Sequence, residues 1–487
     1  MIFNSIDFAF FLPIVFILYW LVSDQNLRLQ NFLIVAASYI FYGWWDWRFL
    51  ALILISSLVD YFVGLGLSKQ ENLSKRKILL SISIFVNLGF LGIFKYYNFF
   101  LDNFTTVFSF LGSEIKATSL HIIIPVGISF YTFQTMSYSI DIYKRKLAPT
   151  KDFIAFSAFV SFFPQLVAGP IERATHLLPQ FLTKRTFDYS KAIDGMRQIL
   201  WGLFKKIVIA DNCAEYANLI FNNSLDYSGC TLLLGAVFFT FQIYCDFSGY
   251  SDIAIGTSRL FGFDLKRNFN FPYFSRNIAE FWRCWHISLS SWFRDYLYIP
   301  LGGSRGSTLM KIRNIFIIFI VSGFWHGANW TFIAWGFLNA LYIMPSIIFK
   351  TNRNNFSIVA QGKFFPTPKE FISMCVTFGL TIFAWIFFRA KDIHHAFNYI
   401  YDMFTGLVSK SSYVQAFNLI NTKIGYVIPM LLICFLLIEW IGREQEHALA
   451  NLGLKWKRSL RHSMYYGIIA TILLLEGEEQ QFIYFQF

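Results

Sequence analysis

The residues of this chain that could do chemistry are ionisable side chains set in apolar sequence, and they gather between Asp246 and His326. The stretch holds two histidines, His286 and His326, and two neighbouring carboxylates, Asp246 and Asp252. Because ionisable groups are costly inside a lipid bilayer, such residues mark functional sites by default. The sequence therefore predicts chemistry carried out within a membrane.

His326 follows an apolar run, Ile315–Trp325, whose only polar side chain is Ser322. Burial disfavours the charged form of an imidazole, so we expect this histidine to be neutral. A neutral imidazole is suited to act as a general base. Gly323 and Gly327 flank it and would let a neighbouring helix or an extended substrate chain approach closely. A structural histidine bonded to a carbonyl is the alternative.

The segment around His286 has the periodicity of one amphipathic helix that ends at Pro300. Its apolar stripe consists of Ile278, Phe281, Trp285, Leu289, Trp292 and Tyr296. Its narrow polar face consists of Arg276, Arg283, His286, Ser290 and Arg294. One interpretation is an interfacial helix whose arginines reach toward the membrane surface. The other is that His286 acts in catalysis while Arg283, Ser290 and Arg294 bind substrate.

Asp246 and Asp252 are separated only by FSGYS. We expect them to give structural support by capping a helix or pairing with the arginines. A site for a coupling ion is the alternative. No cluster of His, Cys or acidic residues has the spacing of metal ligands, so no metal site is predicted.

The elements that must position these residues are membrane helices. Hydrophobic residues make up 56% of the 487 positions and charged residues 14%, whereas soluble domains carry roughly 25% charged residues. We predict an all-α polytopic membrane protein, one domain over 1–487, with about 11 to 13 embedded segments, some of them re-entrant or interfacial. The expected segments are Phe8–Val22, Phe32–Trp44, Phe49–Leu67, Ile78–Phe94, Ile122–Ile140, Phe153–Ala168, Ile199–Ala210, Leu232–Phe247, Ile315–Trp325, Phe332–Phe349, Phe371–Phe388, Ile424–Trp440 and Met464–Leu475.

The formal charge of +12 fits the accumulation of Lys and Arg in cytoplasmic loops. Basic clusters at 69–77, 144–151 and 455–461 mark cytoplasmic loops, and the connector Leu101–Leu120 suits the outer side. Both termini are then expected outside. The chain has no internal repeat, which disfavours the secondary transporters that are built from duplicated halves.

Several longer motifs carry a family resemblance. They are VGISFYTFQTMSYSIDIY at 126–143, FPQLVAGPIER at 163–173, CDFSGYSDIAIG at 245–256, FNFPYFSRNIAEFWRCWHISLSSWFRDYLYIPLGG at 269–303, GFWHGANWTFIAWG at 323–336 and the terminal FIYFQF. Together they resemble the membrane-bound O-acyltransferase family, in its bacterial branch for alginate O-acetylation.

The resemblance implies a central funnel and tunnel through the bilayer with a paired-histidine site. His326 falls on the family's general base and His286 on its partner, which would orient the acceptor or stabilise charge. Trp325 and Asn329, from the same motif as His326, are expected to contact substrate. A transient acyl-histidine remains open.

The resemblance also implies that the protein lies in the lipid of the bacterial inner membrane and serves the O-acetylation of an exported polysaccharide. An acyl thioester, acetyl-CoA, would be the donor, with no bound cofactor. The partners would be a periplasmic acetyltransferase and the polysaccharide. Nucleic acid is not expected as a partner. The alternatives are D-alanyl transfer to teichoic acid and, in a different class, a transporter with a midplane polar site.

Overall fold

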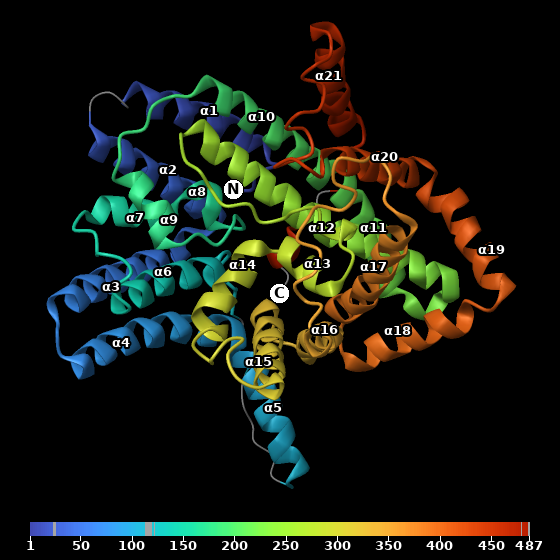
Figure 1. Cartoon of the computed structure of the whole chain (residues 1–487), viewed down its shortest axis with the longest axis horizontal. Helices are drawn as coiled ribbons and strands as arrows, with labels where there is room; N and C mark the ends of the chain where they lie inside the picture. Colours follow the sequence, from blue (N-terminus) through green and yellow to red (C-terminus); the bar gives the residue numbers. More distant parts are fainter. Residues whose placement is uncertain (23–25, 113–118, 121, 479, 486–487) are drawn as a thin grey trace. The chain divides into compact units, whose positions relative to one another are not determined.

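A computed structural model describes residues 1–22, 26–112, 119–120, 122–478 and 480–485. Every regular element among these residues is a helix (Figure 1), which confirms the predicted all-α polytopic membrane fold. The chain divides into two compact units. Unit 1 comprises Met1–Gly195 with Thr257–Lys266, and unit 2 comprises Met196–Gly256 with Arg267–Phe487.

Unit 1 is built from the N-terminal helices. These are α1 (Ile6–Leu21), α2 (Leu27–Asp46), α3 (Leu50–Lys69), α4 (Leu73–Leu91), α5 (Tyr97–Phe110), α6 (Ile128–Tyr143), α7 (Phe153–Ser161), α8 (Phe163–Leu166) and α9 (Ala174–Phe181). Helix α3 packs on α4 and on α6, and α4 also packs on α6, so these three helices form one bundle.

Unit 2 carries the predicted site. Helices α10 (Tyr189–Leu203) and α12 (Gly229–Leu260) cross the boundary between the units along the chain. The others are α11 (Asn212–Asn222), α13 (Ile278–Cys284), α14 (Ile287–Phe293), α15 (Thr308–His326), α16 (Trp330–Ile348), α17 (Pro368–Arg389), α18 (Ile393–Gly406), α19 (Lys410–Leu419), α20 (Val427–Gly442) and α21 (Arg458–Leu474). A π-helical turn, Phe204–Asp211, joins α10 to α11.

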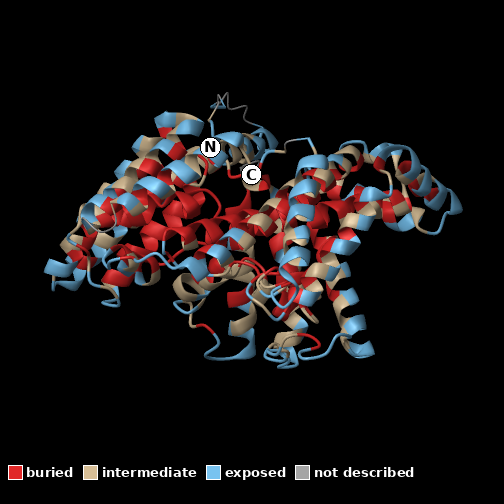
Figure 2. Ribbon diagram, turned by 90° about the horizontal axis from the view of Figure 1, so that it is seen from above, coloured by how far each residue is buried: buried red, intermediate tan, exposed pale blue. Residues whose placement is uncertain are grey.

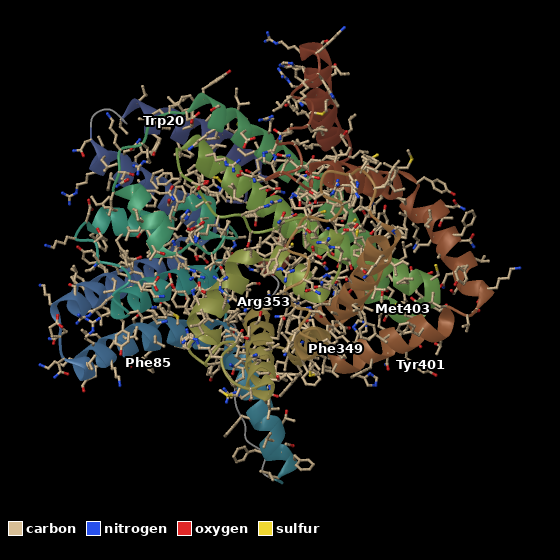
Figure 3. The ribbon with its side chains drawn as sticks, viewed as in Figure 1. Trp20, Phe85, Phe349, Arg353, Tyr401 and Met403 are labelled. Carbon is tan, nitrogen blue, oxygen red and sulfur yellow. The ribbon has the colours of Figure 1, made fainter. Side chains whose placement is uncertain are left out.

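Six helical stretches of the described residues are long and apolar enough to cross a membrane, or seven if α19 and α20, bent by 94°, form one broken span. Buried residues lie inside the helix bundles and exposed positions lie on the outward helix faces (Figure 2). Many of these exposed side chains are apolar. Phe85 on α4 and Phe349 after α16 are 79% and 75% exposed and project from the ribbon (Figure 3), as expected of lipid-facing residues.

The predicted segments correspond to helices, but several of their bounds differ. Helix α6 begins only at Ile128, six residues after the predicted start at Ile122. The predicted span Phe153–Ala168 is broken at Phe162, just before Pro164, into α7 and α8. Helices α5, α9, α11, α18 and α19 lie outside the segments that the sequence predicts. Residues 113–118 of the predicted outer connector lie outside the described residues.

Candidate active site

The segment around His286 is not one continuous helix, and that prediction was wrong. Helix α13 ends at Cys284 and α14 begins at Ile287, with His286 between them at a left-handed φ of 42°. The break is held by backbone pairing, since Ile287 N–H donates to the Asn268 carbonyl at 2.8 Å. It turns His286 away from the arginines with which a continuous helix would align it. The chain does leave the helix before Pro300, as expected.

His286 is buried, with 1% of its surface exposed, so the interfacial interpretation does not hold for this residue. Its Nδ1 lies 3.0 Å from Asn268 Oδ1. Asn268 donates through Nδ2 to Ser251 Oγ, which identifies Oδ1 as its acceptor oxygen. An amide oxygen only accepts, so the ring proton belongs on Nδ1 and the lone pair on Nε2. Burial lowers the pKa of His286 to about 3, so the ring is neutral at physiological pH.

His326 is the last residue of α15 and is 2% exposed. The expectation that glycines admit a close neighbour is confirmed, and the neighbour is α16. A Cβ on Gly323 would lie 2.2 Å from the Phe332 carbonyl oxygen, and one on Gly327 would lie 2.1 Å from the Phe332 ring. The α15–α16 pair therefore packs at backbone contact, which fixes the end of α15 and the histidine it carries.

Aromatic rings enclose both imidazoles. The His326 ring centroid lies 5.1 Å from that of Trp335 and 5.3 Å from that of Phe388. Phe247 packs edge-on against His286 at 4.6 Å. The indole of Trp325 faces both histidines, at 5.0 Å from His326 and 6.2 Å from His286. The two histidines, far apart in sequence, thus share one apolar environment in unit 2.

Tyr484, near the C-terminus, also contacts both histidines. Its ring centroid lies 5.6 Å from that of His326 and 6.3 Å from that of His286. The phenol ring therefore brings a hydroxyl-bearing residue next to both imidazoles. Gln486 and Phe487, the end of the FIYFQF motif, lie outside the described residues.

The C-terminal segment is held in this position by buried charges. Asp246 on α12 accepts a hydrogen bond from the Ile483 backbone N–H at 2.7 Å. The same carboxylate pairs with Lys206 Nζ at 2.9 Å, and Lys206 donates to the Gln480 carbonyl at 3.0 Å. Asp246 and Lys206 therefore bind the backbone on either side of Phe482 and position the tyrosine that follows.

Asp252 has a lysine partner as well. Its carboxylate lies 2.6 Å from Lys205 Nζ and accepts a hydrogen bond from Gln198 at 2.8 Å. The prediction of ion pairing for both acids is therefore confirmed, but their partners are Lys205 and Lys206 of the π-helical turn and not the arginines of the 276–294 segment. Gly202 and Gly249 allow this arrangement, since a Cβ on Gly202 would lie 2.6 Å from the Gly249 carbonyl oxygen.

The other residues expected to bind substrate lie in different places. Arg294 pairs with Asp295 at 2.8 Å, and its side chain is 62% exposed. Ser290 Oγ donates to the Trp285 carbonyl at 3.4 Å. Asn329 caps α16 and donates to the Lys391 carbonyl at 2.9 Å. Of this group, only Trp325 is placed in ring contact with the two histidines.

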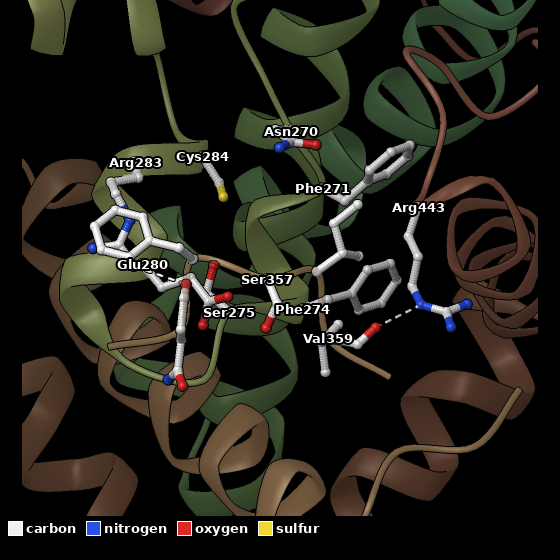
Figure 4. Close-up of a pocket in the computed structure, with 13 residues that line it drawn as sticks. Asn270, Phe271, Phe274, Ser275, Glu280, Arg283, Cys284, Ser357, Val359 and Arg443 are labelled. Carbon is white, nitrogen blue, oxygen red and sulfur yellow. Dashed lines mark hydrogen bonds between the residues drawn. The ribbon is translucent and has the colours of Figure 1, made fainter. Parts of the chain in front are cut away.

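Arg283 lines a pocket of about 200 Å³ (Figure 4), together with Asn270, Phe271, Ser275, Cys284, Ser357, Val359 and Arg443. Its guanidinium donates to the carbonyls of Asn352, Asn354 and Asn355 and stacks over Phe356 at 4.8 Å. Carbonyls are neutral, and no described carboxylate forms an ion pair with Arg283. Glu280 also lines the pocket, but its carboxylate pairs with Arg276 at 2.8 Å. Cys284 in the wall is two residues from His286.

Comparison with known proteins decides the family. The model of the membrane-bound O-acyltransferase family matches residues 145–387, which include both histidines. A probable alginate O-acetylase of Pseudomonas putida is 36% identical, with 100% of each chain covered. A peptidoglycan O-acetyltransferase of Helicobacter pylori is 33% identical, over 100% of this chain and 98% of the relative. The chain belongs to the membrane-bound O-acyltransferase family.

Within this family the chain is a multi-pass membrane enzyme, an O-acyltransferase. A teichoic acid D-alanyltransferase of Bacillus subtilis is similar over a smaller part, 27% identical across 55% of this chain and 70% of the relative.

Two residues of this candidate site escaped prediction from the sequence. Tyr484 was noted only as part of the terminal FIYFQF motif, although it is the one residue there with a side-chain hydroxyl. Asn268, which orients His286, stands in the loop RNFNF at 267–271, which has no distinguishing pattern. Both reach the site through long-range packing, which local spacing does not encode.

The buried lysines of this acyltransferase give a stability prediction. Lys206 neutralises Asp211 at 2.7 Å and Asp246 at 2.9 Å, all nearly fully buried. Lys206→Met leaves two buried carboxylates without their cation, and we expect a loss of about 3 to 5 kcal/mol of stability. Asp246→Asn leaves a neutral Lys206–Asp211 pair and costs much less. Thermal unfolding of the purified variants in detergent measures both, and equal losses would contradict this assignment.

Proposed function

We propose that this protein moves an acetyl group from a cytoplasmic thioester, acetyl-CoA, through the membrane toward hydroxyls of an exported polysaccharide. A periplasmic acetyltransferase would receive the group and complete the transfer. The proposal places the protein in the bacterial inner membrane with its N-terminus outside. Two of the similar proteins are named as a probable alginate O-acetylase and a peptidoglycan O-acetyltransferase, which supports acetyl as the group.

The observation that carries the proposal is the convergence of His286 and His326 on Trp325 and Tyr484. Both imidazoles are almost completely buried. A buried neutral imidazole can take a proton from a hydroxyl and return it to a leaving group, which is what acyl transfer requires. The enclosing aromatic rings exclude water that would hydrolyse the acyl group.

The reaction follows from this arrangement. The hydroxyl oxygen attacks the thioester carbonyl and forms the new ester bond, while the carbon–sulfur bond breaks. His326 takes the hydroxyl proton and returns it to the departing sulfur, so the released product is the thiol. His286, fixed by Asn268, would orient the acceptor or stabilise the charge that develops on the carbonyl oxygen. The attacking hydroxyl could be that of Tyr484, because the ring of this residue lies beside both imidazoles.

The donor would approach from the pocket in Figure 4. Arg283 and Arg443 line this pocket, and a guanidinium suits a phosphate group, which arginine binds well. Helix α17 begins beside this region, because Glu370 in its first turn pairs with Arg276 at 3.0 Å. Basic residues surround this end, including Lys363, Lys369 and Arg443, which favours the cytoplasmic side. The pocket volume fits part of a donor, such as a phosphate.

The acceptor would approach from the opposite end of α17. That helix has 22 residues, about 33 Å at 1.5 Å per residue, a full bilayer crossing. Just beyond it lies a polar pocket of about 400 Å³, lined by residues that include Asp226, Lys391, Asp392, His394 and Asn398. Phe388 in the last turn contacts His326, so the histidine lies near this end of the helix.

The test measures O-acetyl groups released by mild base from surface polysaccharide, in cells with and without the protein. We expect acetylation with the native chain and none with His326→Ala, which should still accumulate in the membrane. Unchanged acetylation in cells making His326→Ala would refute the proposal. D-alanine esters in place of acetyl would favour the teichoic acid alternative. The transporter alternative is weakened because lysines pair with Asp246 and Asp252, which it needed as ion ligands.

A further inference from the structure

A second polar site lies in unit 1 and shares no residue with the proposed acyl-transfer site. Asp60 stands near the middle of α3, a candidate membrane helix, and is 0% exposed. Its Oδ1 accepts hydrogen bonds from Ser83 Oγ and Ser139 Oγ, each at 2.5 Å. Its Oδ2 accepts one from Asn87 Nδ2 at 2.7 Å. The three donors come from α4 and α6, so this carboxylate joins the helices of the bundle.

Further oxygens surround this carboxylate. Asn87 Oδ1 accepts from Ser56 Oγ at 2.9 Å and from Thr135 Oγ1 at 3.1 Å. Ser57, three residues before Asp60 and so on the same face of α3, is completely buried, and its hydroxyl has no hydrogen-bond partner among the described residues. The site is therefore made of one carboxylate and several hydroxyl and amide oxygens, the hard donors that alkali and alkaline-earth cations prefer.

Asp60 differs from the buried acids of unit 2 in its charge balance. Asp246 and Asp252 each pair with a lysine, whereas no described Lys, Arg or His forms an ion pair with Asp60. An ionised carboxylate in a bilayer is costly unless a cation neutralises it. One carboxylate balances one positive charge, so a monovalent cation leaves the site neutral and a divalent cation would leave a buried excess charge.

We propose that Asp60, with Ser56, Ser57, Asn87 and the hydroxyls of α6, forms a sodium site that fastens α3, α4 and α6 together. A proton is the other monovalent cation, but the donors argue against it. Hydrogen bonds given to the charged form favour it, and the Asn87 amide N–H, which can only donate, gives one to Oδ2. The sodium site goes beyond the proposed acyl transfer, and its existence does not depend on that reaction.

The experiment is thermal unfolding of the purified full-length protein in detergent, with sodium chloride exchanged for choline chloride at constant ionic strength. We expect Tm to rise by about 3 to 6 °C between about 1 and 100 mM sodium, because a ligand that binds only the folded state stabilises it. Potassium should give a smaller rise, since the ion is larger. Asp60→Asn should unfold at a temperature independent of sodium. Asp102→Asn, the same change at an exposed position of α5, should keep the full sodium response.

Direct binding gives a second readout that does not depend on how Asp60→Asn folds. Equilibrium dialysis with radioactive sodium should find about one ion per native chain. Equal Tm values in sodium and choline, together with no bound sodium, would overturn the proposal. It would also be overturned if Tm followed pH and ignored sodium, because the neutralising cation would then be a proton. Every arm measures binding or unfolding, so none of these outcomes bears on the acyl-transfer proposal.

Discussion

Replacing His326 by glutamine should lower the acyl-transfer rate of the purified protein by about 10³-fold, within the range for loss of a general base. Glutamine fills much of the same space between Trp335 and Phe388, so the α15–α16 pair should remain intact. It cannot accept a proton and return it to sulfur. The rate is measured as thiol released from acetyl-CoA by protein in lipid nanodiscs.

The matched control is His462→Gln on α21. This half-buried imidazole contacts only its own helix, through the Arg458 carbonyl and two tyrosines, among the interactions described. This variant should keep the native rate. If His326→Gln kept its rate as well, the base would have to be another group, and the assignment of His326 would be wrong.

Tyr484→Phe should lower transfer to the acceptor by about 10²-fold, comparable with losing one positioned group in a catalytic site. The change removes one oxygen and keeps the ring that packs against His286 and His326. It also leaves the backbone tether from Ile483 to Asp246 in place. The folded state should therefore be preserved while the hydroxyl is lost. Tyr466→Phe, on the exposed side of α21, is the control and should transfer at the native rate.

Mass spectrometry of the C-terminal peptide, after a brief incubation with acetyl-CoA, extends this test. If Tyr484 receives the acyl group first, the native peptide gains an acetyl group and the Tyr484→Phe peptide does not. If the phenol only positions the acceptor, the rate falls without any acetylated peptide. A native rate in Tyr484→Phe would remove this hydroxyl from the mechanism.

The helical membrane fold and the position of His326 could be predicted because local sequence carries them. Apolar runs with short polar connectors require helices in a bilayer. A histidine at the end of such a run, between two glycines, must be buried where another helix comes close. Both features depend on neighbouring residues, and the structure confirms both at α15 and α16.

The position of His286 could not be predicted from periodicity. A helical wheel assumes helical dihedrals throughout, whereas His286 adopts φ 42° and its break is stabilised by Asn268, 18 residues earlier. The contact of Tyr484 with the histidines depends on Asp246, more than 200 residues away in sequence. Asp60 lies within the predicted apolar segment Phe49–Leu67, where a single acid changes the average hydropathy too little to be noticed. Each of these features is set by tertiary packing.

The central claim is that His286 and His326 act in one site, and a double-mutant comparison tests it most directly. Acetyl-CoA-dependent thiol release is measured for His286→Ala, His326→Ala and the double variant. Groups that act as a unit have non-additive effects. The rate of the double variant should therefore be at most about 3-fold lower than the rate of the His326→Ala variant. If the two losses multiplied in the double variant, the histidines would be acting independently, and the single site proposed for them would be wrong.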